Sequence, residues 1–266
     1  MHEHGSRLSG GNQKVRVLVV SDISLVGNAS AQVATSVLNH MGISTGVLPV
    51  AVLSSQTGGV EDFSYYDMQE HFDEILLKWH ALGVEFDAVY TGYCGSRSVI
   101  EKTTSIVKYF KEKGARIFVD PVLGDFGRLY EGFTSDMPDA MRDLVALADV
   151  IFPNSTEWSL LEGDKQSSPL APVTVVTGIR KDDRLANILL DKDGETPFFT
   201  ADRPGEFHCA GDLFASITIG ELINGADIKN SVEKATRFVE KCIDCSVKES
   251  LDRRLGLPFE RFLKEL

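Results

Sequence analysis

Small and polar residues recur directly after the buried apolar runs of this chain, where several of them could meet and carry out chemistry. The sets are Ser21-Asp22, Thr57-Gly58-Gly59, Thr91-Gly92-Tyr93, Asp120 with Asp125, Asn154 with Glu157, Thr177-Gly178 and Cys209-Ala210-Gly211-Asp212. A polar residue after a strand is more often a turn or a helix cap than part of a site. In open α/β sheets, however, ligands bind beyond the carboxyl ends of the strands. The convergence of these sets at one sheet edge therefore predicts a binding site.

The stretch His208-Cys209-Ala210-Gly211-Asp212-Leu213-Phe214-Ala215 is the most informative, because small residues precede an acid and an apolar helix follows. Free backbone amides at the start of a helix bind phosphate charge. A carboxylate in the first turn, Asp212, can take a proton from an incoming hydroxyl group. The alternative is that Asp212 only complements the helix dipole. The stretch alone favours neither interpretation.

Two further pairs of residues with side-chain oxygens fit a magnesium ion that is held partly through water. Asp120 and Asp125 lie in Asp120-Pro121-Val122-Leu123-Gly124-Asp125, directly after a buried strand. Carboxylate oxygens beside a phosphate site are ligands that Mg²⁺ prefers. Asn154 and Glu157, three residues apart on one helix face, suit the same task. The alternative is that Asn154 caps the helix and Glu157 completes a capping box with it, and both interpretations can hold together.

Several classes of site are excluded by their missing signatures. The chain has no Gly-x4-Gly-Lys-Ser/Thr phosphate loop, no Gly-x-Gly-x-x-Gly after its first strand and no Gly-x-Ser-x-Gly elbow. Cys242 and Cys245 have the spacing of a metal or redox pair, but they fall late in a predicted helix without a second pair, so we expect them to pack in the structure.

The elements that must position these residues alternate between short apolar runs and amphipathic stretches, which is typical of a parallel sheet with helical crossovers. We expect strands at 15–20, 43–52, 88–90, 116–119, 150–152 and 173–176, and an antiparallel edge hairpin at 185–190 and 197–200. We expect helices at 26–40, 66–82, 98–113, 138–148, 155–161, 211–224 and 228–246. The pattern predicts a three-layer α/β/α fold with a mostly parallel central sheet, formed by one domain over 15–266 after a flexible arm, 1–14.

Composition narrows the possible partners. The 266 residues carry a formal net charge of −12 and contain no basic block, which argues against nucleic acid or an anionic membrane as partner. No apolar run is long enough for a membrane span. Four unevenly spaced cysteines do not form a secreted disulfide framework. We therefore expect a cytoplasmic enzyme that binds a small molecule.

Taken in order, the motifs resemble the pyridoxal/pyridoxamine kinase family of the ribokinase-like superfamily, over about 15–246. The matching stretches are Val26-Gly27-Asn28, Thr57-Gly58-Gly59, Thr91-Gly92-Tyr93-Cys94-Gly95-Ser96, Asp120-Pro121-Val122-Leu123-Gly124-Asp125, Pro153-Asn154-Ser155-Thr156-Glu157, Val176-Thr177-Gly178 and Gly211-Asp212-Leu213-Phe214. The resemblance implies a ribokinase-like fold, and transfer of the ATP γ-phosphoryl group to the 5′-hydroxymethyl group of pyridoxal, pyridoxamine or pyridoxine.

The resemblance also implies a role for each motif. Asp212 would be the general base, and the amides of Cys209, Ala210 and Gly211 would form the anion hole. Nucleotide contacts are expected at Asp120, Asp125, Asn154, Glu157, Thr177 and Gly178, with Mg²⁺ held through Asp120, Asn154 and Glu157. The pyridine ring would lie against Ser21 or Asp22, Thr57 and Tyr93, under a flap at 54–63. A homodimer is expected, and the need for K⁺ is left open.

The chain departs from the family pattern at three places. Cys209-Ala210-Gly211-Asp212 replaces the usual Gly-Thr-Gly-Asp, so a side chain stands where glycine lets the backbone approach phosphate. Phe152 replaces a small polar residue, and the segment 163–172 is short for the extra helix of this fold. The Cys209 thiol either points into the site, where it would crowd the γ-phosphate, or faces the core, which is the orientation that we favour. The helix start lowers its pKa and the charge of Asp212 opposes that shift.

Two other functions remain open. A hydroxymethylpyrimidine kinase of thiamine synthesis would share the fold and attack through a similar hydroxymethyl group. A catalytically weak protein that senses vitamin B6 or nucleotide is the alternative from another class. The altered anion hole favours the sensor, whereas the retained Asp212 favours an enzyme.

Overall fold

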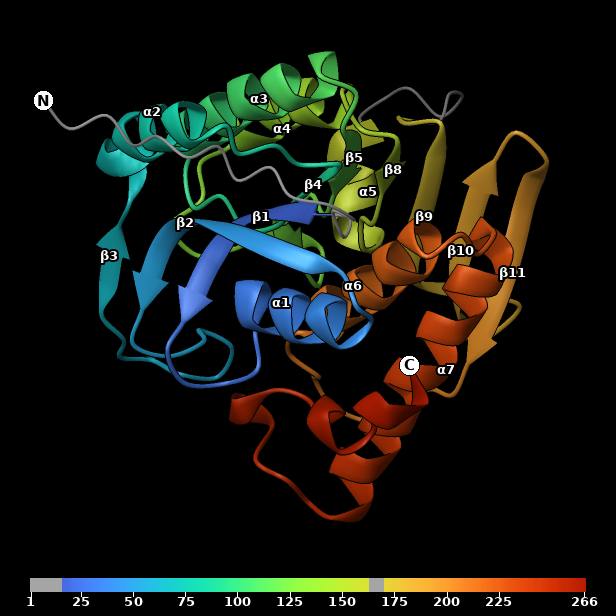
Figure 1. The fold of residues 1–266 in the computed structure, drawn as a ribbon. Coiled ribbons are helices and arrows are strands. Elements are labelled where there is room, and N and C mark those ends of the chain that lie inside the picture. The colour runs from blue at the N-terminus through green and yellow to red at the C-terminus, as the bar shows by residue number, and fades with distance from the viewer. Residues whose placement is uncertain (1–15, 163–169) are drawn as a thin grey trace, which may run out of the picture.

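The computed structural model describes residues 16–162 and 170–266 (Figure 1). The predicted arm, 1–14, and most of the short segment 163–172 lie outside the described residues. No helix among the residues described is both long enough and apolar enough to cross a membrane.

A nine-stranded sheet in the order β11-β10-β9-β8-β5-β4-β1-β2-β3 forms the middle layer. Its parallel strands are β1 (Arg16–Ser24), β2 (Ser44–Leu53), β4 (Ala88–Thr91), β5 (Arg116–Val119), β8 (Val150–Ile151) and β9 (Val173–Lys181). Antiparallel strands close both edges: β3 (Tyr65–Asp67) at one, and β10 (Arg184–Asp191) with β11 (Gly194–Thr200) at the other. The predicted mostly parallel sheet and its edge hairpin are confirmed.

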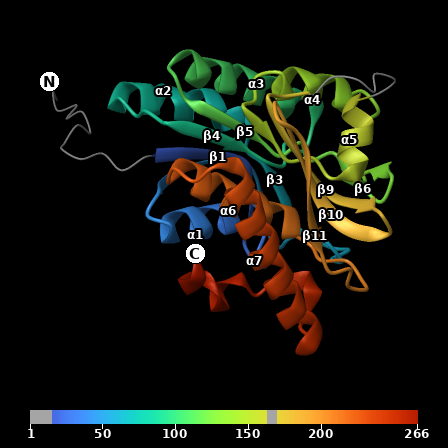
Figure 2. The same cartoon turned by 90° about the vertical axis from the view of Figure 1, so that its right-hand side faces the viewer.

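Helices cover both faces of the sheet (Figures 1 and 2). On one face lie α1 (Ser30–His40), α6 (Ala210–Ile223) and α7 (Ile228–Lys248); on the other lie α2 (Phe72–Leu82), α3 (Arg97–Glu112), α4 (Met137–Val145) and α5 (Ser155–Glu162). β1 shows why its apolar run is unbroken: Val17 and Val19 pack under α1 and α6, while Leu18 and Val20 pack on the opposite side. Strands buried on both faces read as continuous aliphatic runs.

Two predicted helices begin later than their patterns suggested. The predicted helix 66–82 starts as β3, whose residues pair with Ala51–Leu53 of β2, and a short 3-10 turn, Gln69–His71, precedes α2. The predicted helix 26–40 begins at Ser30; the chain bends before it, and the Asn28 amide donates to the Leu255 carbonyl (2.8 Å). In both segments the spacing of the apolar residues is helical, but backbone hydrogen bonds to another segment delay the start of the helix.

The structure adds elements that the sequence pattern did not predict. A small hairpin, β6 (Gly124–Asp125) with β7 (Arg128–Leu129), follows β5. Three 3-10 turns, Arg253–Leu255, Phe259–Arg261 and Leu263–Glu265, end the chain. The predicted packing role is confirmed for Cys242, which is fully buried in the α6–α7 cluster, but not for Cys245, which is half-buried with its sulfur 3.5 Å from Glu249 Oε1. Phe152 is also buried and packs edge-on against Phe214, with 6.4 Å between ring centroids.

Candidate active site

Asp212 lies in the first turn of α6, with its carboxylate turned toward the loop before α1. Its Oδ2 accepts a hydrogen bond from the Ser30 amide (3.0 Å). Burial and the charge of Asp22 raise the pKa of Asp212 to about 7, and the bond from Ser30 offsets part of that rise. A carboxyl group whose pKa lies near neutrality is suited to accept a proton from a substrate hydroxyl group.

Asp120 follows β5 and lies against the start of α6. A Cβ atom added to Gly211 would lie 3.9 Å from Asp120 Oδ2, so the carboxylate approaches the backbone of the predicted anion hole. Burial raises the pKa of Asp120 strongly, and the charges of Glu157 and Asp212 raise it further. Like-charged carboxylates this close favour a cation or a proton between them.

Asn154 and Glu157 form a complete capping box at the start of α5. Asn154 Oδ1 accepts from the Thr156 and Glu157 amides (2.8 and 2.9 Å), and Glu157 Oε2 accepts from the Asn154 amide (2.9 Å). The box also holds the loop after β5, since Glu157 Oε1 accepts from the Leu123 amide (3.0 Å) and Asn154 Nδ2 donates to the Gly124 carbonyl (2.8 Å). The capping interpretation is confirmed, and it fixes the position of the Asp120 loop.

The remaining predicted nucleotide residues follow along the same edge of the sheet. Asn154 and Thr177 form a parallel bridge beyond β8 and β9, and the Gly178 amide donates to Asn187 Oδ1 (3.3 Å). Gly178 has a φ of 70°, which favours glycine, and no atom would contact a Cβ there. Asp125 is half-buried in β6 and accepts from the Phe126 amide (2.8 Å).

Ser21 and Asp22 are buried at the end of β1, beside the loop that carries Tyr93. The Ser21 and Ser24 hydroxyl groups donate to Asp22 (3.4 and 3.2 Å), yet burial still raises the pKa of this carboxyl. Burial raises the pKa of both Tyr93 and Asp212, and the charge of Asp22 raises each further. Tyr93 is half-buried and can offer its ring face to a ligand.

Thr57 is exposed, whereas its neighbour Gln56 is buried and had no sequence signal. Gln56 Oε1 accepts from the Gly58 amide (3.0 Å), and its Nε2 donates to the carbonyls of Gly58 (2.8 Å) and Arg254. Gly58 packs so closely on His208 that an added Cβ would lie 2.3 Å from the ring. The predicted flap therefore rests on the loop before α6.

The favoured core orientation of Cys209 is wrong, whereas the expected rise of its pKa through the charge of Asp212 is confirmed. Its thiol lies 3.9 Å from Gln56 Oε1 and beside Asp212, not in the apolar core. Burial raises the pKa of the thiol, and the charges of Asp212 and Asp22 raise it further. These effects outweigh the lowering of the pKa by the helix start, so the thiol that faces the site is neutral.

Cys209→Gly is expected to stabilise the fold and to speed turnover. Cys209 has a φ of 65°, a left-handed conformation that costs a residue with a Cβ roughly 1–2 kcal/mol. Glycine removes this cost and the thiol that crowds the anion hole. Chemical unfolding with steady-state kinetics measures both effects. Cys245→Gly, within α7, is the matched control and should lose about 1 kcal/mol instead.

A labelling experiment tests, without any substitution, whether the Cys209 thiol lies at the anion hole. Alkylation of Cys209, read by peptide mass, should be suppressed by Mg-ATP, while alkylation of half-buried Cys245 should not change. Equal labelling of Cys209 with and without Mg-ATP would show that Cys209 is not part of the anion hole.

Comparison with known proteins gives a consistent family. A family model described as phosphomethylpyrimidine kinase matches residues 34–252. A Caenorhabditis elegans protein provisionally described as a pyridoxal kinase is 26% identical over 88% of this chain and 82% of its own length.

Solved structures of similar proteins superpose on almost the whole of this chain. A Bacteroides thetaiotaomicron protein, provisionally described as a phosphomethylpyrimidine kinase, superposes with a TM-score of 0.90 at 31% identity and covers 96% of this chain and 95% of its own. A second crystal form of that protein, described as containing pyridoxal, has a TM-score of 0.88 at 30% identity over 95% and 96%. Pyridoxal kinase from Lactobacillus plantarum has a TM-score of 0.85 at 28% identity over 94% and 96%.

Proposed function

Because this chain belongs to the phosphomethylpyrimidine kinase family and is a kinase of ribokinase-like fold, we propose that it phosphorylates a vitamin B6 vitamer. The acceptor is the 5′-hydroxymethyl group of pyridoxal, pyridoxamine or pyridoxine, and the donor is ATP. The observation that carries the substrate is the pyridoxal in the crystal of a relative 30% identical over 95% of this chain. The position and pKa of Asp212 support the reaction.

Asp212 is the general base in this proposal. Its carboxylate takes the proton of the substrate hydroxyl group, the oxygen bonds to the γ-phosphorus, and the bond from that phosphorus to the β,γ-bridging oxygen breaks to release ADP. The amides of Cys209, Ala210, Gly211 and Asp212 start α6 and face the charge that develops on the γ-phosphoryl group. Burial, with a smaller contribution from the charge of Asp22, raises the pKa of Asp212 to about 7, so it can act near neutral pH.

Mg²⁺ fits the donor set of Asp120, Asn154 and Glu157 through water. Their oxygens are hard ligands, and burial together with the charges of Glu157 and Asp212 raises the pKa of Asp120, which a nearby cation would offset. Within the ranges 16–162 and 170–266, no group of three or more His, Cys, Asp or Glu side chains forms a ready-made metal cage. When bound, Mg²⁺ would offset charge on the ATP phosphates. K⁺ remains an open requirement.

The other contacts follow the order of the sheet. We place the nucleotide along Asp125, Thr177 and Gly178, and the pyridine ring against Ser21, Asp22, Thr57 and Tyr93, beneath the flap. Residues 15–266 would act as one cytoplasmic kinase domain in a homodimer.

A hydroxymethylpyrimidine kinase is the second candidate, and the description of the matching family favours it. Release of ADP should be measured with pyridoxal, pyridoxamine, pyridoxine and hydroxymethylpyrimidine at matched concentrations. Turnover confined to the pyridine substrates is expected. Preference for the pyrimidine would replace the proposal, and binding without turnover on any substrate would favour the sensor.

A further inference from the structure

His208 stands immediately before the predicted anion hole, 209–212, and is not among the residues assigned to the site. Its side chain is half-buried, so part of the imidazole remains open to a ligand. The ring packs on the flap, because a Cβ atom added to Gly58 would lie 2.3 Å from its Cγ atom, and one added to Gly59 would lie 3.8 Å from its Nε2 atom. The imidazole therefore lies where the anion hole meets the flap.

The flap contacts this imidazole without occupying its nitrogen atoms. The Gly58 amide donates to Gln56 Oε1 (3.0 Å), and the Gly58 carbonyl accepts from Gln56 Nε2 (2.8 Å). The ring thus rests on a piece of backbone whose polar groups already have partners. Across the part of the chain that the structure describes, neither ring nitrogen of His208 takes part in a hydrogen bond. An imidazole offers at least one N–H donor, and here that donor is available to a ligand.

The site needs such a donor, because it is acidic and has to bind a polyanion. None of the residues assigned to it is a lysine or an arginine, and its acids are Asp22, Asp120, Asp125, Glu157 and Asp212. Negative charge around a cleft disfavours the approach of another anion. Mg²⁺ and the amides that start α6 offset part of this repulsion. A side-chain N–H group beside those amides would offset more of it.

We propose that the imidazole of His208 donates a hydrogen bond to a non-bridging oxygen of the γ-phosphoryl group of ATP. The inference rests on the proposed kinase reaction and names a further residue of that site. The Nδ1 atom lies against the flap, 2.4 Å from a Cβ atom added to Gly58, so we assign Nε2 as the donor. No proton leaves the imidazole, and the bonds made and broken are those of the phosphoryl transfer described above.

This hydrogen bond would serve the transfer in two ways. It holds the γ-phosphoryl group against the amides of 209–212, next to the hydroxyl group that Asp212 activates. It also strengthens as negative charge develops on the phosphoryl oxygens, because hydrogen bonds to charged acceptors are stronger than those to neutral ones. Since Gly58 packs on the ring, the flap fixes the direction of the N–H group.

The alternative is that His208 only supports the flap by packing. Two substitutions separate the donor from the ring. His208→Gln keeps an N–H donor and loses the ring, whereas His208→Phe keeps a flat ring against Gly58 and loses both nitrogen atoms. A hydrogen bond to phosphate predicts that glutamine is the better replacement, and packing predicts that phenylalanine is.

Nucleotide affinity, measured by calorimetry with Mg²⁺ and without a vitamer, tests the donor. The probes are ADP and AMP-PNP, an ATP analogue that has a γ-phosphoryl group but is not cleaved in the assay. We expect His208→Phe to weaken AMP-PNP binding about 10–100-fold, the range for a hydrogen bond to a charged group, and to leave ADP affinity unchanged. His208→Gln should retain most of the AMP-PNP affinity. In steady-state assays His208→Phe should lower kcat at least about tenfold, with KM for the vitamer unchanged.

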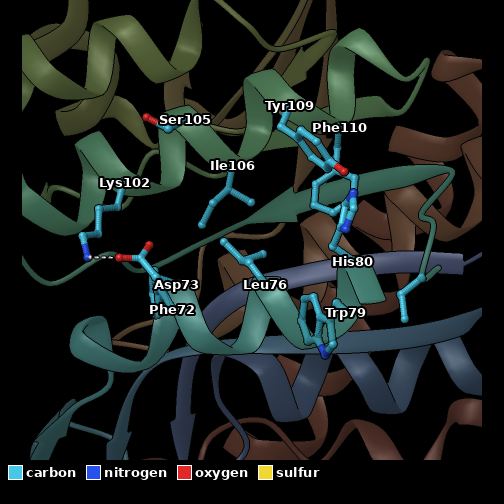
Figure 3. A pocket seen from close by; sticks show the side chains of 11 residues that line it. Phe72, Asp73, Leu76, Trp79, His80, Lys102, Ser105, Ile106, Tyr109 and Phe110 are labelled. Atoms are coloured by element: carbon cyan, nitrogen blue, oxygen red, sulfur yellow. Dashed lines mark ion pairs between the residues drawn. The ribbon is translucent and has the colours of Figure 1, made fainter. Parts of the chain in front are cut away.

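A matched control comes from the groove between α2 and α3 (Figure 3), which has a volume of about 450 Å³ and is lined by none of the assigned site residues. His80 lines this groove together with Trp79 and Tyr109. His80→Phe makes the same chemical change outside the site. It should leave both nucleotide affinities and kcat unchanged.

Three results overturn the proposal. Equal losses of AMP-PNP and ADP affinity in His208→Phe would show that the lost contact does not belong to the γ-phosphoryl group. Full AMP-PNP affinity in His208→Phe, with a loss in His208→Gln, would assign the ring to packing. A raised KM for the vitamer with unchanged AMP-PNP affinity would place the imidazole against the acceptor instead.

Failure of the proposed function gives a different result. No vitamer would then be phosphorylated, while AMP-PNP would still bind and its affinity would still depend on His208. ADP binding also verifies that each variant is folded.

Discussion

Asp212→Asn is expected to reduce turnover at least about 100-fold while ATP still binds, because a positioned general base contributes roughly 10²–10⁴ to the rate. The asparagine amide cannot take the hydroxyl proton, yet it has almost the same volume and can still accept from Ser30 through its oxygen. Nucleotide affinity, measured by calorimetry, should therefore change little. Turnover near that of the unchanged protein would reject the assignment of the base.

The pH profile provides a second test of the same residue. Burial raises the pKa of Asp212 to about 7, so the base is increasingly protonated as pH falls below that value. We expect kcat/KM of the unchanged protein to fall about tenfold per pH unit below pH 7. In Asp212→Asn this acidic limb should disappear from the residual activity.

The raised pKa also predicts a stability effect of opposite sign to the activity effect. Between about pH 4 and 7 the unfolded chain releases the Asp212 proton while the folded chain retains it, so stability is lost as pH rises through that window. A rise from 3.8 to about 7 corresponds to at most about 4 kcal/mol at 1.36 kcal/mol per unit. The true value is smaller because the side chain is only half-buried and water screens its charge. Asp212→Asn should therefore be more stable than the unchanged protein at pH 8 and equally stable near pH 4.

Asp227→Asn is the matched control, since Asp227 also stands at a helix start. Its carboxylate accepts from the Asn230 amide (3.0 Å), and that bond lowers its pKa. This substitution should leave turnover unchanged and should not stabilise the fold at pH 8. Equal stability changes in the two variants would show that the gain at Asp212 has nothing to do with its pKa.

The parallel layers and much of the site could be predicted because their signals are local. The strand Arg116–Val119 has the predicted bounds, and the acid that follows it, Asp120, lies at the carboxyl edge as the strand pattern required. The capping box of Asn154 and Glu157 is likewise a local pattern, since three residues separate its members. Local periodicity and turn chemistry are recorded directly in sequence.

Contacts to distant backbone groups could not be predicted. Gln56 is held by the carbonyl of Arg254, and Asn28 by that of Leu257, which lie 198 and 229 residues away. A carbonyl acceptor carries no side-chain signature, so nothing in the residue types marks these partners. The hydrogen bond from the Ser30 amide to Asp212 could not be predicted for the same reason. The pairing of β3 with β2 was missed because the apolar residues of this segment recur at helical spacing.

Glu157→Gln is expected to raise the Mg²⁺ concentration for half-maximal activity about 10–100-fold, the typical cost of removing a group that orients metal ligands. Both oxygens of Glu157 are occupied by the Leu123 and Asn154 amides, so it acts on a water-bound ion by fixing the loop that carries Asp120. In the variant one amide group meets an NH₂ group instead of an oxygen. An unsatisfied buried donor costs about 1–3 kcal/mol, so the free energy of unfolding should fall as well.

Measuring both quantities separates the two roles of Glu157. Mg²⁺ titrations should be run well below the unfolding temperature of the variant, and Glu162→Gln, at the end of the same helix, should alter neither quantity. Lower stability with an unchanged Mg²⁺ titration would restrict Glu157 to capping α5. A shifted titration would show that Glu157 acts on the ion, either by fixing the loop that carries Asp120 or through the remaining lone pairs of its carboxylate.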